Sequence, residues 1–106
     1  LIDAVTALSG GGPAYVFLLT ECMVQAGIDA GLPAELSSQL ARVTVSGAGE
    51  LMRQSDETPS TLRENVTSPG GTTAEALKIL MANDAWQSLM TRAISAATAR
   101  SRELAG

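Results

Sequence analysis

One segment constrains the fold of this chain more than any other, because Pro13 to Gly31 reads as a helix that is apolar on every side. Pro13 suits a first helical turn, where its missing N–H costs nothing, and Gly31 is typical of the position just after a helix. The large apolar residues point in nearly every direction around the axis: Val16, Phe17, Leu18, Leu19, Cys22, Met23, Val24 and Ile28. Such a helix has to be covered all round, so we predict that many neighbouring helices or a partner chain wrap it.

The rest of the chain is also helical in period, and no segment alternates apolar and polar residues as a strand does. The pattern predicts further helices over residues 1–8, 33–55, 60–65, 72–83 and 84–104. Thr72 with Glu75 matches the capping box that opens a helix, and Asp84 with Gln87 repeats the pattern at the last helix. The sequence therefore predicts an all-α fold, a bundle of five to six helices in a single domain spanning residues 1–106.

Small residues interrupt the predicted helix 33–55 at Gly47, Ala48 and Gly49. Each glycine inside a helix costs roughly 1 kcal/mol relative to alanine. A helix that carries this cost usually does so because another helix approaches it closely there. We expect Gly47 to mark such a contact.

Composition excludes several classes of function. Of the 106 residues, 45% are hydrophobic and only 17% are charged, which suggests that another domain or subunit covers much of the surface. The net charge is −4 and no block of Lys or Arg is present, which argues against nucleic acid and against a polybasic membrane anchor. The chain has no histidine, the commonest general base and metal ligand, so we expect no metal site.

The single cysteine and the ends of the chain bear on its compartment. Cys22 lies in an apolar run and cannot form an internal disulfide, so we predict a buried, reduced thiol and a cytoplasmic location. No signal peptide is visible, and the longest apolar run, Ala14 to Leu19, is too short to span a bilayer. The chain opens at Leu1, which suggests a piece of a larger protein.

Two glycine-rich stretches could hold an anion. Gly10-Gly11-Gly12-Pro13 lacks the G-x-G-x-x-G spacing, a preceding strand and a Walker lysine, so a hinge between helices is favoured over a nucleotide loop. The second stretch, "SPGGTT" from Ser68 to Thr73, combines two glycines and three hydroxyls at a helix start, where free N–H groups attract anions. It contains no Lys or Arg, so its residues leave two readings open: an ordinary capped turn, or a site for a small carboxylate.

Two signatures in the chain resemble those of pyrroline-5-carboxylate reductases. They are "DAVTALSGGGPAYVF" from Asp3 to Phe17 and "ENVTSPGGTTAEAL" from Glu64 to Leu77. The resemblance continues through "AGIDAGLP" and the closing "AATARSRELA", and it matches only the C-terminal half of that family. Where members commonly have a serine, this chain has Gly11, and where they often have histidine before a proline, it has Thr58, which can serve as a helix cap.

The resemblance implies a function. These enzymes reduce 1-pyrroline-5-carboxylate to L-proline with NADPH or NADH, the last step of proline biosynthesis. An N-terminal Rossmann domain, absent from this chain, binds most of the cofactor. The helical domain interlocks with a second copy to form a homodimer, and some members assemble further. With the family in view, the apolar helix and the small residues at Gly47 are expected to form the dimer core.

The resemblance also assigns roles to individual residues. Ser68 would donate its hydroxyl to the substrate carboxylate, and Thr72 and Thr73 would donate N–H groups. Gly70 and Gly71 would keep the backbone close to the substrate. The Thr73 hydroxyl would face the ring nitrogen as the catalytic contact, although water could deliver the proton instead. Asn65 and Val66 would border the nicotinamide of the cofactor.

Two other readings remain open at this point. The chain could be a non-catalytic helical homodimerisation module in which "SPGGTT" is only a capped turn. It could also be the helical domain of a related NAD(P)H-dependent imine or keto-acid reductase. A strand followed by a dinucleotide fingerprint upstream of Leu1 would favour an enzyme over the module.

Overall fold

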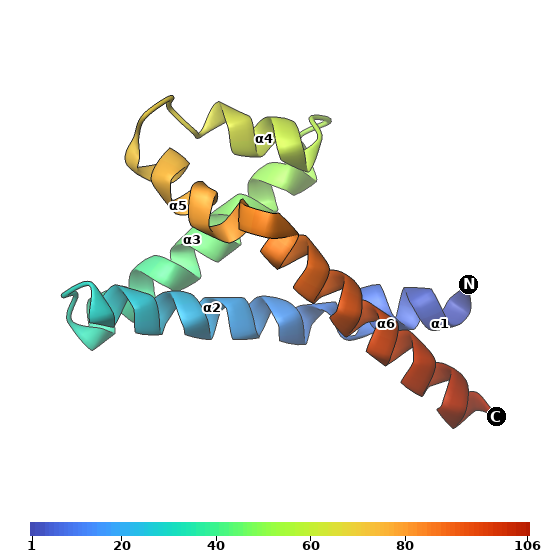
Figure 1. Ribbon diagram of the computed structural model, residues 1–106. Coiled ribbons are helices and arrows are strands. Elements are labelled where there is room, and N and C mark those ends of the chain that lie inside the picture. Colours follow the sequence, from blue (N-terminus) through green and yellow to red (C-terminus); the bar gives the residue numbers. More distant parts are fainter. The chain divides into compact units, whose positions relative to one another are not determined.

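The computed structural model describes residues 1–106, and all of its regular structure is helical (Figure 1). The elements in chain order are α1 (Ile2–Val5), the π-helical turn η1 (Thr6–Gly10), α2 (Gly12–Asp29), α3 (Ala34–Gln54), α4 (Pro59–Asn65), α5 (Thr72–Met81), the 3-10 turn η2 (Ala82–Asp84) and α6 (Ala85–Ala105). The all-α prediction is confirmed. Only α2, α3, α5 and α6 are longer than seven residues, so the predicted count of five to six is slightly high unless the single-turn α1 and the short α4 are included.

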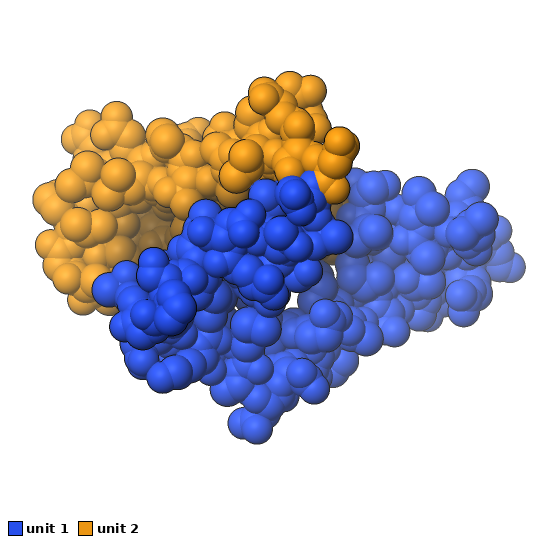
Figure 2. Space-filling view, turned by 90° about the horizontal axis from the view of Figure 1, so that it is seen from above, with its two compact units in different colours: residues 1–11, 57–106 blue, residues 12–56 orange.

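The chain divides into two compact units, which Figure 2 colours separately. Unit 1 comprises residues 1–11 and 57–106, and unit 2 comprises residues 12–56. One boundary falls between Gly11 and Gly12, inside the glycine-rich stretch. The other falls in the turn between α3 and α4.

Unit 2 is a hairpin of α2 and α3, and the turn between them has the geometry that the sequence predicted. Gly31 takes a φ of +111°, a left-handed conformation that suits glycine. Its N–H donates to the carbonyl of Ile28 at 2.9 Å, and the N–H of Leu32 donates to the carbonyl of Gly27 at 3.0 Å. These two bonds form a Schellman motif, which satisfies the last carbonyls of α2 and ends the helix.

Close to this turn, α2 and α3 are locked together by a buried serine. Ser37 is only 2% exposed, and its hydroxyl donates a hydrogen bond of 2.8 Å to the carbonyl of Val24. The serine packs directly against Gly27, where even a methyl group would overlap its Oγ. Ala41, one turn further along α3, is also buried. Two small residues and one glycine therefore allow the helices to approach closely here.

Unit 1 is built around α6, which packs against α1, η1 and α5. The Ser101 hydroxyl donates to the Asp3 carboxylate at 2.8 Å, and the Arg102 Nε lies 3.9 Å from the other oxygen of that carboxylate. Ala7, in η1, is buried. These contacts tie the first residues of the chain to the last helix.

A kink between α5 and α6 corrects one sequence prediction. Asn83 and Asp84 both adopt left-handed conformations, with φ of 54° and 53°. Asp84 occupies the N-cap position of α6, as predicted, but its side chain makes no capping hydrogen bond. Gln87 also does not complete a capping box, because its amide donates to the hydroxyl of Thr91 at 3.0 Å. The kink turns Asp84 out of the extended backbone that a capping side chain needs.

Very little of the chain is buried within the single subunit, and this overturns the prediction for Cys22. Only Ala7, Ser37 and Ala41 are buried, and no residue of α2 is among them. Cys22 is exposed, as are Phe17 at 67% and Leu18 at 59%. The apolar faces of α2 have no cover from their own chain. Of the two arrangements predicted for this helix, wrapping by a partner chain is the one that such exposure favours.

Two further sequence predictions, the helix contact at Gly47 and the absence of a membrane-spanning segment, can be compared with the structure. A side chain at Gly47 or Gly49 would have no neighbour within 4 Å, so no helix of the same chain approaches α3 there. The helical run Ile2–Asp29 has a mean hydropathy of 1.3 in its most apolar window and is long enough to cross a membrane, although its longest unbroken apolar run is short. A core helix of a soluble protein meets the same criteria.

Candidate functional site

The "SPGGTT" segment forms a tight turn that leads directly into α5. The N–H of Gly71 donates to the carbonyl of Ser68 at 3.0 Å, which closes a four-residue β-turn. Pro69 and Gly70 occupy its two central positions, and Gly70 has a φ of +73°. Proline followed by a residue with positive φ is the signature of a type II turn. The type II turn therefore accounts for Pro69 and Gly70 without any bound ligand.

The second glycine, Gly71, has a different role, because its lack of a side chain allows Ser68 to lie close to it. A Cβ on Gly71 would lie 3.2 Å from the Ser68 carbonyl oxygen and 3.4 Å from the Ser68 Cβ. A side chain at this position would push the serine away. Gly71 is also the N-cap residue of α5, so its contact with Ser68 holds the serine beside the first turn of the helix.

The predicted capping box at the start of α5 does not form. The helix begins at Thr72 with Gly71 as its N-cap, one position earlier than the capping box requires, and no side chain caps it. Glu75 does not reach back to the helix start, because its carboxylate pairs with the Lys78 ammonium at 2.8 Å. The N-terminus of α5 is therefore free of the carboxylate that would otherwise occupy it.

The first turn of α5 presents its backbone N–H groups to an outside acceptor. The Gly71 N–H is used in the turn, and the Glu75 N–H bonds to the Gly71 carbonyl at 3.3 Å. Between them, the N–H groups of Thr72, Thr73 and Ala74 have no acceptor within the helix. Thr72 and Thr73 are the donors that the resemblance implied, whereas Ala74 was not among them. These groups lie at the positive end of the helix dipole.

Three hydroxyls belong to the same segment as these amides. Ser68, Thr72 and Thr73 are all exposed, and none of their hydroxyls bonds to another group of the chain. The predicted substrate-binding residues Ser68, Gly70, Gly71, Thr72 and Thr73 are neighbours in the sequence, and they form this turn and the first residues of α5. A single carboxylate matches this set of donors, because uncharged amides and hydroxyls can surround it.

The predicted cofactor-contacting residues lie just before the turn. Asn65 is the last residue of α4 and Val66 follows it, and both are exposed. Thr67, which the sequence reading did not single out, fixes the exit of the chain from α4. Its N–H donates to the Glu64 carbonyl at 3.0 Å, and its hydroxyl donates to the Arg63 carbonyl at 2.6 Å. A threonine four residues after Arg63, at a helix end, often bonds the carbonyl four residues earlier, so the sequence could have predicted this hydrogen bond.

The start of α4 is capped as the sequence predicted. The Thr58 hydroxyl accepts a hydrogen bond of 3.2 Å from the N–H of Thr61, and Pro59 occupies the first helical position. Threonine therefore serves as the cap at the position where the resembling family often has histidine. No group of three or more His, Cys, Asp or Glu side chains is arranged to hold a metal ion.

The fold and this site define a class of protein. The chain is an all-α domain whose apolar helices lack cover from their own subunit and whose α5 begins without a side-chain cap. A family model described as pyrroline-5-carboxylate reductase dimerisation matches residues 1–104. The chain therefore belongs to the pyrroline-5-carboxylate reductase family and matches its dimerisation domain, which indicates self-association.

Individual relatives agree with this assignment. A pyrroline-5-carboxylate reductase of Pseudomonas aeruginosa is 48% identical over 104 residues, which are 98% of this chain and 38% of the relative. One from Glycine max is 46% identical over 102 residues, which are 96% of this chain and 37% of the relative. The chain thus spans less than half the length of the curated relatives it matches.

Solved structures of the same family share the fold. A pyrroline-5-carboxylate reductase from Coxiella burnetii matches with a TM-score of 0.92 and 40% identity, over 97% of this chain and 38% of that one. A pyrroline carboxylate reductase from Plasmodium falciparum, solved with NADP bound, matches with a TM-score of 0.91 and 38% identity. That match covers 99% of this chain and 40% of the Plasmodium chain.

Proposed function

We propose that residues 1–106 act as one dimerisation and substrate-binding domain of a reductase that converts 1-pyrroline-5-carboxylate to L-proline with NADPH or NADH. The observation that carries this proposal is the match of the family model to residues 1–104. The uncapped start of α5 supports it, because the substrate has the single carboxylate that this set of donors suits. The reaction would be the last step of proline biosynthesis, in the cytoplasm.

In this proposal the residues of the turn bind and orient the substrate. The N–H groups of Thr72, Thr73 and Ala74 and the Ser68 hydroxyl hold its carboxylate. Gly71 keeps Ser68 against the helix start, so the donors are arranged before the substrate arrives. Fixing the carboxylate fixes the ring, and an oriented substrate reacts with a lower entropic barrier.

Thr73 is the catalytic contact of the proposal. Its hydroxyl faces the ring nitrogen and orients the imine by a hydrogen bond. A threonine hydroxyl is far too weak an acid to protonate the imine near neutral pH, so water delivers the proton. The chain needs no nucleophile or metal for this role.

The proposal places the dinucleotide outside this chain. Its Gly10-Gly11-Gly12 stretch lies at a junction between helical segments, not in the strand-to-helix turn that holds a pyrophosphate. The nicotinamide cofactor would supply the hydride, and this chain would contribute at most a border to it through Asn65 and Val66. Most of the cofactor would be bound by a separate domain.

A chimeric enzyme tests the proposal. The chain replaces the matching segment of the Pseudomonas aeruginosa relative, and NADPH oxidation is followed with and without 1-pyrroline-5-carboxylate. We expect oxidation that depends on the substrate. Ser68→Ala should raise KM about tenfold or more, because a hydrogen bond to a charged group contributes about 1.5–3 kcal/mol. Thr73→Ala removes the hydroxyl bond to the uncharged imine nitrogen and should raise KM about twofold to tenfold.

Thr98→Ala is the matched control, because the Thr98 hydroxyl donates to the Ile94 carbonyl within α6, at 2.7 Å. It should leave KM unchanged. Unaltered KM in both loop variants would remove the carboxylate site from the proposal. A folded chimera that oxidises NADPH only with other imines or keto acids would favour a related reductase, and one that dimerises without any turnover would favour a dimerisation module.

A further inference from the structure

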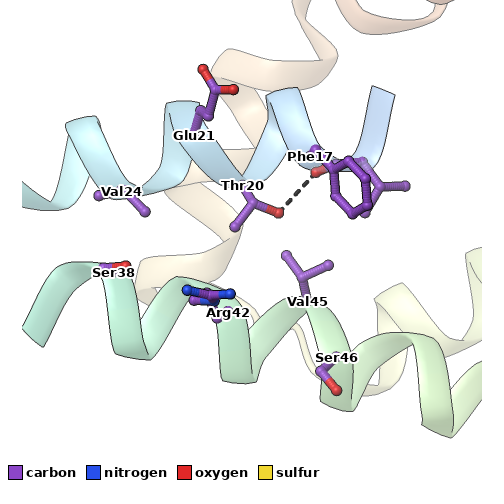
Figure 3. Close-up of a pocket in the computed structure, with 9 residues that line it drawn as sticks. Phe17, Thr20, Glu21, Val24, Ser38, Arg42, Val45 and Ser46 are labelled. Atoms are coloured by element: carbon purple, nitrogen blue, oxygen red, sulfur yellow. Dashed lines mark hydrogen bonds between the residues drawn. The ribbon is translucent and has the colours of Figure 1, made fainter. Parts of the chain in front are cut away.

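An apolar groove runs along unit 2 between α2 and α3 (Figure 3). Its volume is about 420 Å³, and its walls include Val16, Phe17 and Val24 on α2 and Val45 on α3. The Thr20 hydroxyl at its centre donates to the Val16 carbonyl at 2.8 Å, so its polarity is satisfied within the helix. The groove therefore presents a surface that is more favourable in contact with protein than with water.

Two opposite charges also line the groove, Glu21 on α2 and Arg42 on α3. Neither side chain forms an ion pair or a hydrogen bond within the chain, whereas Glu50, Glu75 and Glu103 each pair with a base three residues away on the same helix. Figure 3 shows the Glu21 carboxylate turned away from α3, which separates it from Arg42. The groove thus contains one acid and one base without internal partners.

A second copy of the chain is the occupant that these features fit. The chain matches a dimerisation domain, and the apolar residues beside the groove, such as Phe17, are exposed in the single subunit. Covering the groove removes Glu21 and Arg42 from water, which is costly unless each charge gains a partner. A surface that carries one acid and one base can satisfy both by meeting an identical surface, because in a two-fold interface each contact occurs twice.

We propose that Glu21 of each subunit pairs with Arg42 of the partner subunit in the α2–α3 groove, and that this reciprocal pair sets the register of the dimer. The inference rests on the self-association in the proposed function and assigns residues to it. The apolar walls provide most of the stabilisation, while the charges decide how the two copies align. An alignment that placed Glu21 against the partner's Glu21, or Arg42 against the partner's Arg42, would bury like charges together and is therefore disfavoured.

Charge reversal tests the pair in the 106-residue chain, with the dimer dissociation constant measured by analytical ultracentrifugation. Glu21→Arg alone and Arg42→Glu alone each replace two attractions by two repulsions. Each should raise the dissociation constant at least about 100-fold, on the basis of roughly tenfold per altered pair. The effect should shrink as salt is added, because ions screen the repulsion.

Mixing the two variants distinguishes a pair between subunits from a pair within one subunit. In a heterodimer of Glu21→Arg with Arg42→Glu, both contacts across the two-fold axis again join opposite charges. We expect the mixture to form a heterodimer with an affinity within about tenfold of the wild type. A pair within one subunit would leave both repulsions in place, so failure of the mixture to associate would overturn the proposal.

Matched controls and a milder variant complete the design. Glu64→Arg and Arg63→Glu make the same charge changes on α4, outside the groove, and should leave the dissociation constant unchanged. If Glu21→Arg fails to fold alone, judged by circular dichroism, Glu21→Gln should still weaken the dimer about threefold to tenfold. Variants that dimerise like the wild type would refute the pair but leave dimerisation standing, whereas a monomeric wild type would refute both.

Discussion

The two ends of the α2–α3 hairpin differ sharply in how their helices meet. Near the turn, Ser37 is buried against Gly27 and bonds across to α2. Further along, the helices diverge in Figure 1, an open groove separates them, and a side chain at Gly47 would meet no other part of the chain within 4 Å. Both ends belong to the same unit and both contain small residues. A small residue within a helix therefore shows where close approach is possible, but the structure shows whether the approaching helix belongs to the same chain.

The largest expected change in stability is at the end of the hairpin near the turn, where Ser37 packs against Gly27, which we call the closed end. Gly27→Ala adds a methyl group where the buried Ser37 Oγ lies, so the serine has to lose its bond to Val24 or the helices have to separate. Overpacking of this kind costs about 1–3 kcal/mol and the lost hydrogen bond adds about 1 kcal/mol, while the higher helix propensity of alanine offsets about 1 kcal/mol. We expect a net loss of about 2 kcal/mol in the free energy of unfolding, measured by urea denaturation at fixed protein concentration. A stabilised variant would show that the contact between Gly27 and Ser37 has room for a methyl group.

Ser37→Ala tests the same contact with a smaller change. The substitution removes the hydroxyl but leaves no clash, and the Val24 carbonyl remains in its helix. The free energy of unfolding should fall by about 1 kcal/mol, the usual net contribution of such a bond. Ser38→Ala is the matched control, because Ser38 lines the open groove and its hydroxyl makes no bond that is lost. Equal effects of the two substitutions would contradict a special role for Ser37.

Gly47→Ala examines the open end. Alanine improves the helix propensity of α3 by about 1 kcal/mol, and no atom of the same chain opposes its methyl group. If a partner helix approaches at Gly47, as the sequence predicts, the same substitution should weaken dimerisation. We therefore expect higher helicity of the monomer in dilute solution together with a higher dimer dissociation constant. An unchanged dissociation constant would move the predicted helix contact away from Gly47.

The smallest effect concerns pH at the last turns of α3. The hydrogen bonds from Arg53 and Gln54 hold the pKa of Glu50 below its ordinary value, and the Glu50 carboxylate raises the pKa of Arg53. Because the folded pKa of Glu50 is lowered, its contribution to stability is present above the unfolded pKa and disappears as pH falls through the folded one. Glu50 is exposed, so the effect is small and screened by salt. The difference in Tm between wild type and Glu50→Gln should shrink as the pH falls below the ordinary glutamate pKa of about 4.3, and it should vanish once the carboxylate is protonated in the folded state. A difference that persists there would show that another interaction of Glu50 contributes.

Local features of the fold could be read from the sequence because a few neighbouring residues determine them. The Schellman turn at Gly31 and the cap at Thr58 both follow from the conformational preference of one residue and the hydrogen bonds of its neighbours. The contact between Gly27 and Ser37 could not be read in this way, because it depends on the register between two helices. The burial of Cys22 was predicted wrongly for a related reason: the cover that an apolar helix needs is not in its own chain.

The candidate site was predicted in part. The residues of "SPGGTT" do form one turn at a helix start, with Gly70 after Pro69 in the positive-φ position of a type II turn. The capping box was wrong because a motif match does not fix where a helix begins. Glu75 had two possible partners, the helix start and Lys78, and only the structure shows that it pairs with Lys78.

The discontinuity of unit 1 affects the order in which the chain can fold. The bond from Ser37 to Val24 joins residues 13 apart, whereas the bond from Ser101 to Asp3 joins residues 98 apart. Short loops close in well under a microsecond, and protein synthesis adds only about 5–20 residues per second. The α2–α3 hairpin can therefore form while the ribosome is still translating the rest of the chain. Residues 1–11 have to wait for α6, so unit 1 assembles last, and the exposed faces of α2 remain open to a second nascent or finished chain throughout that interval.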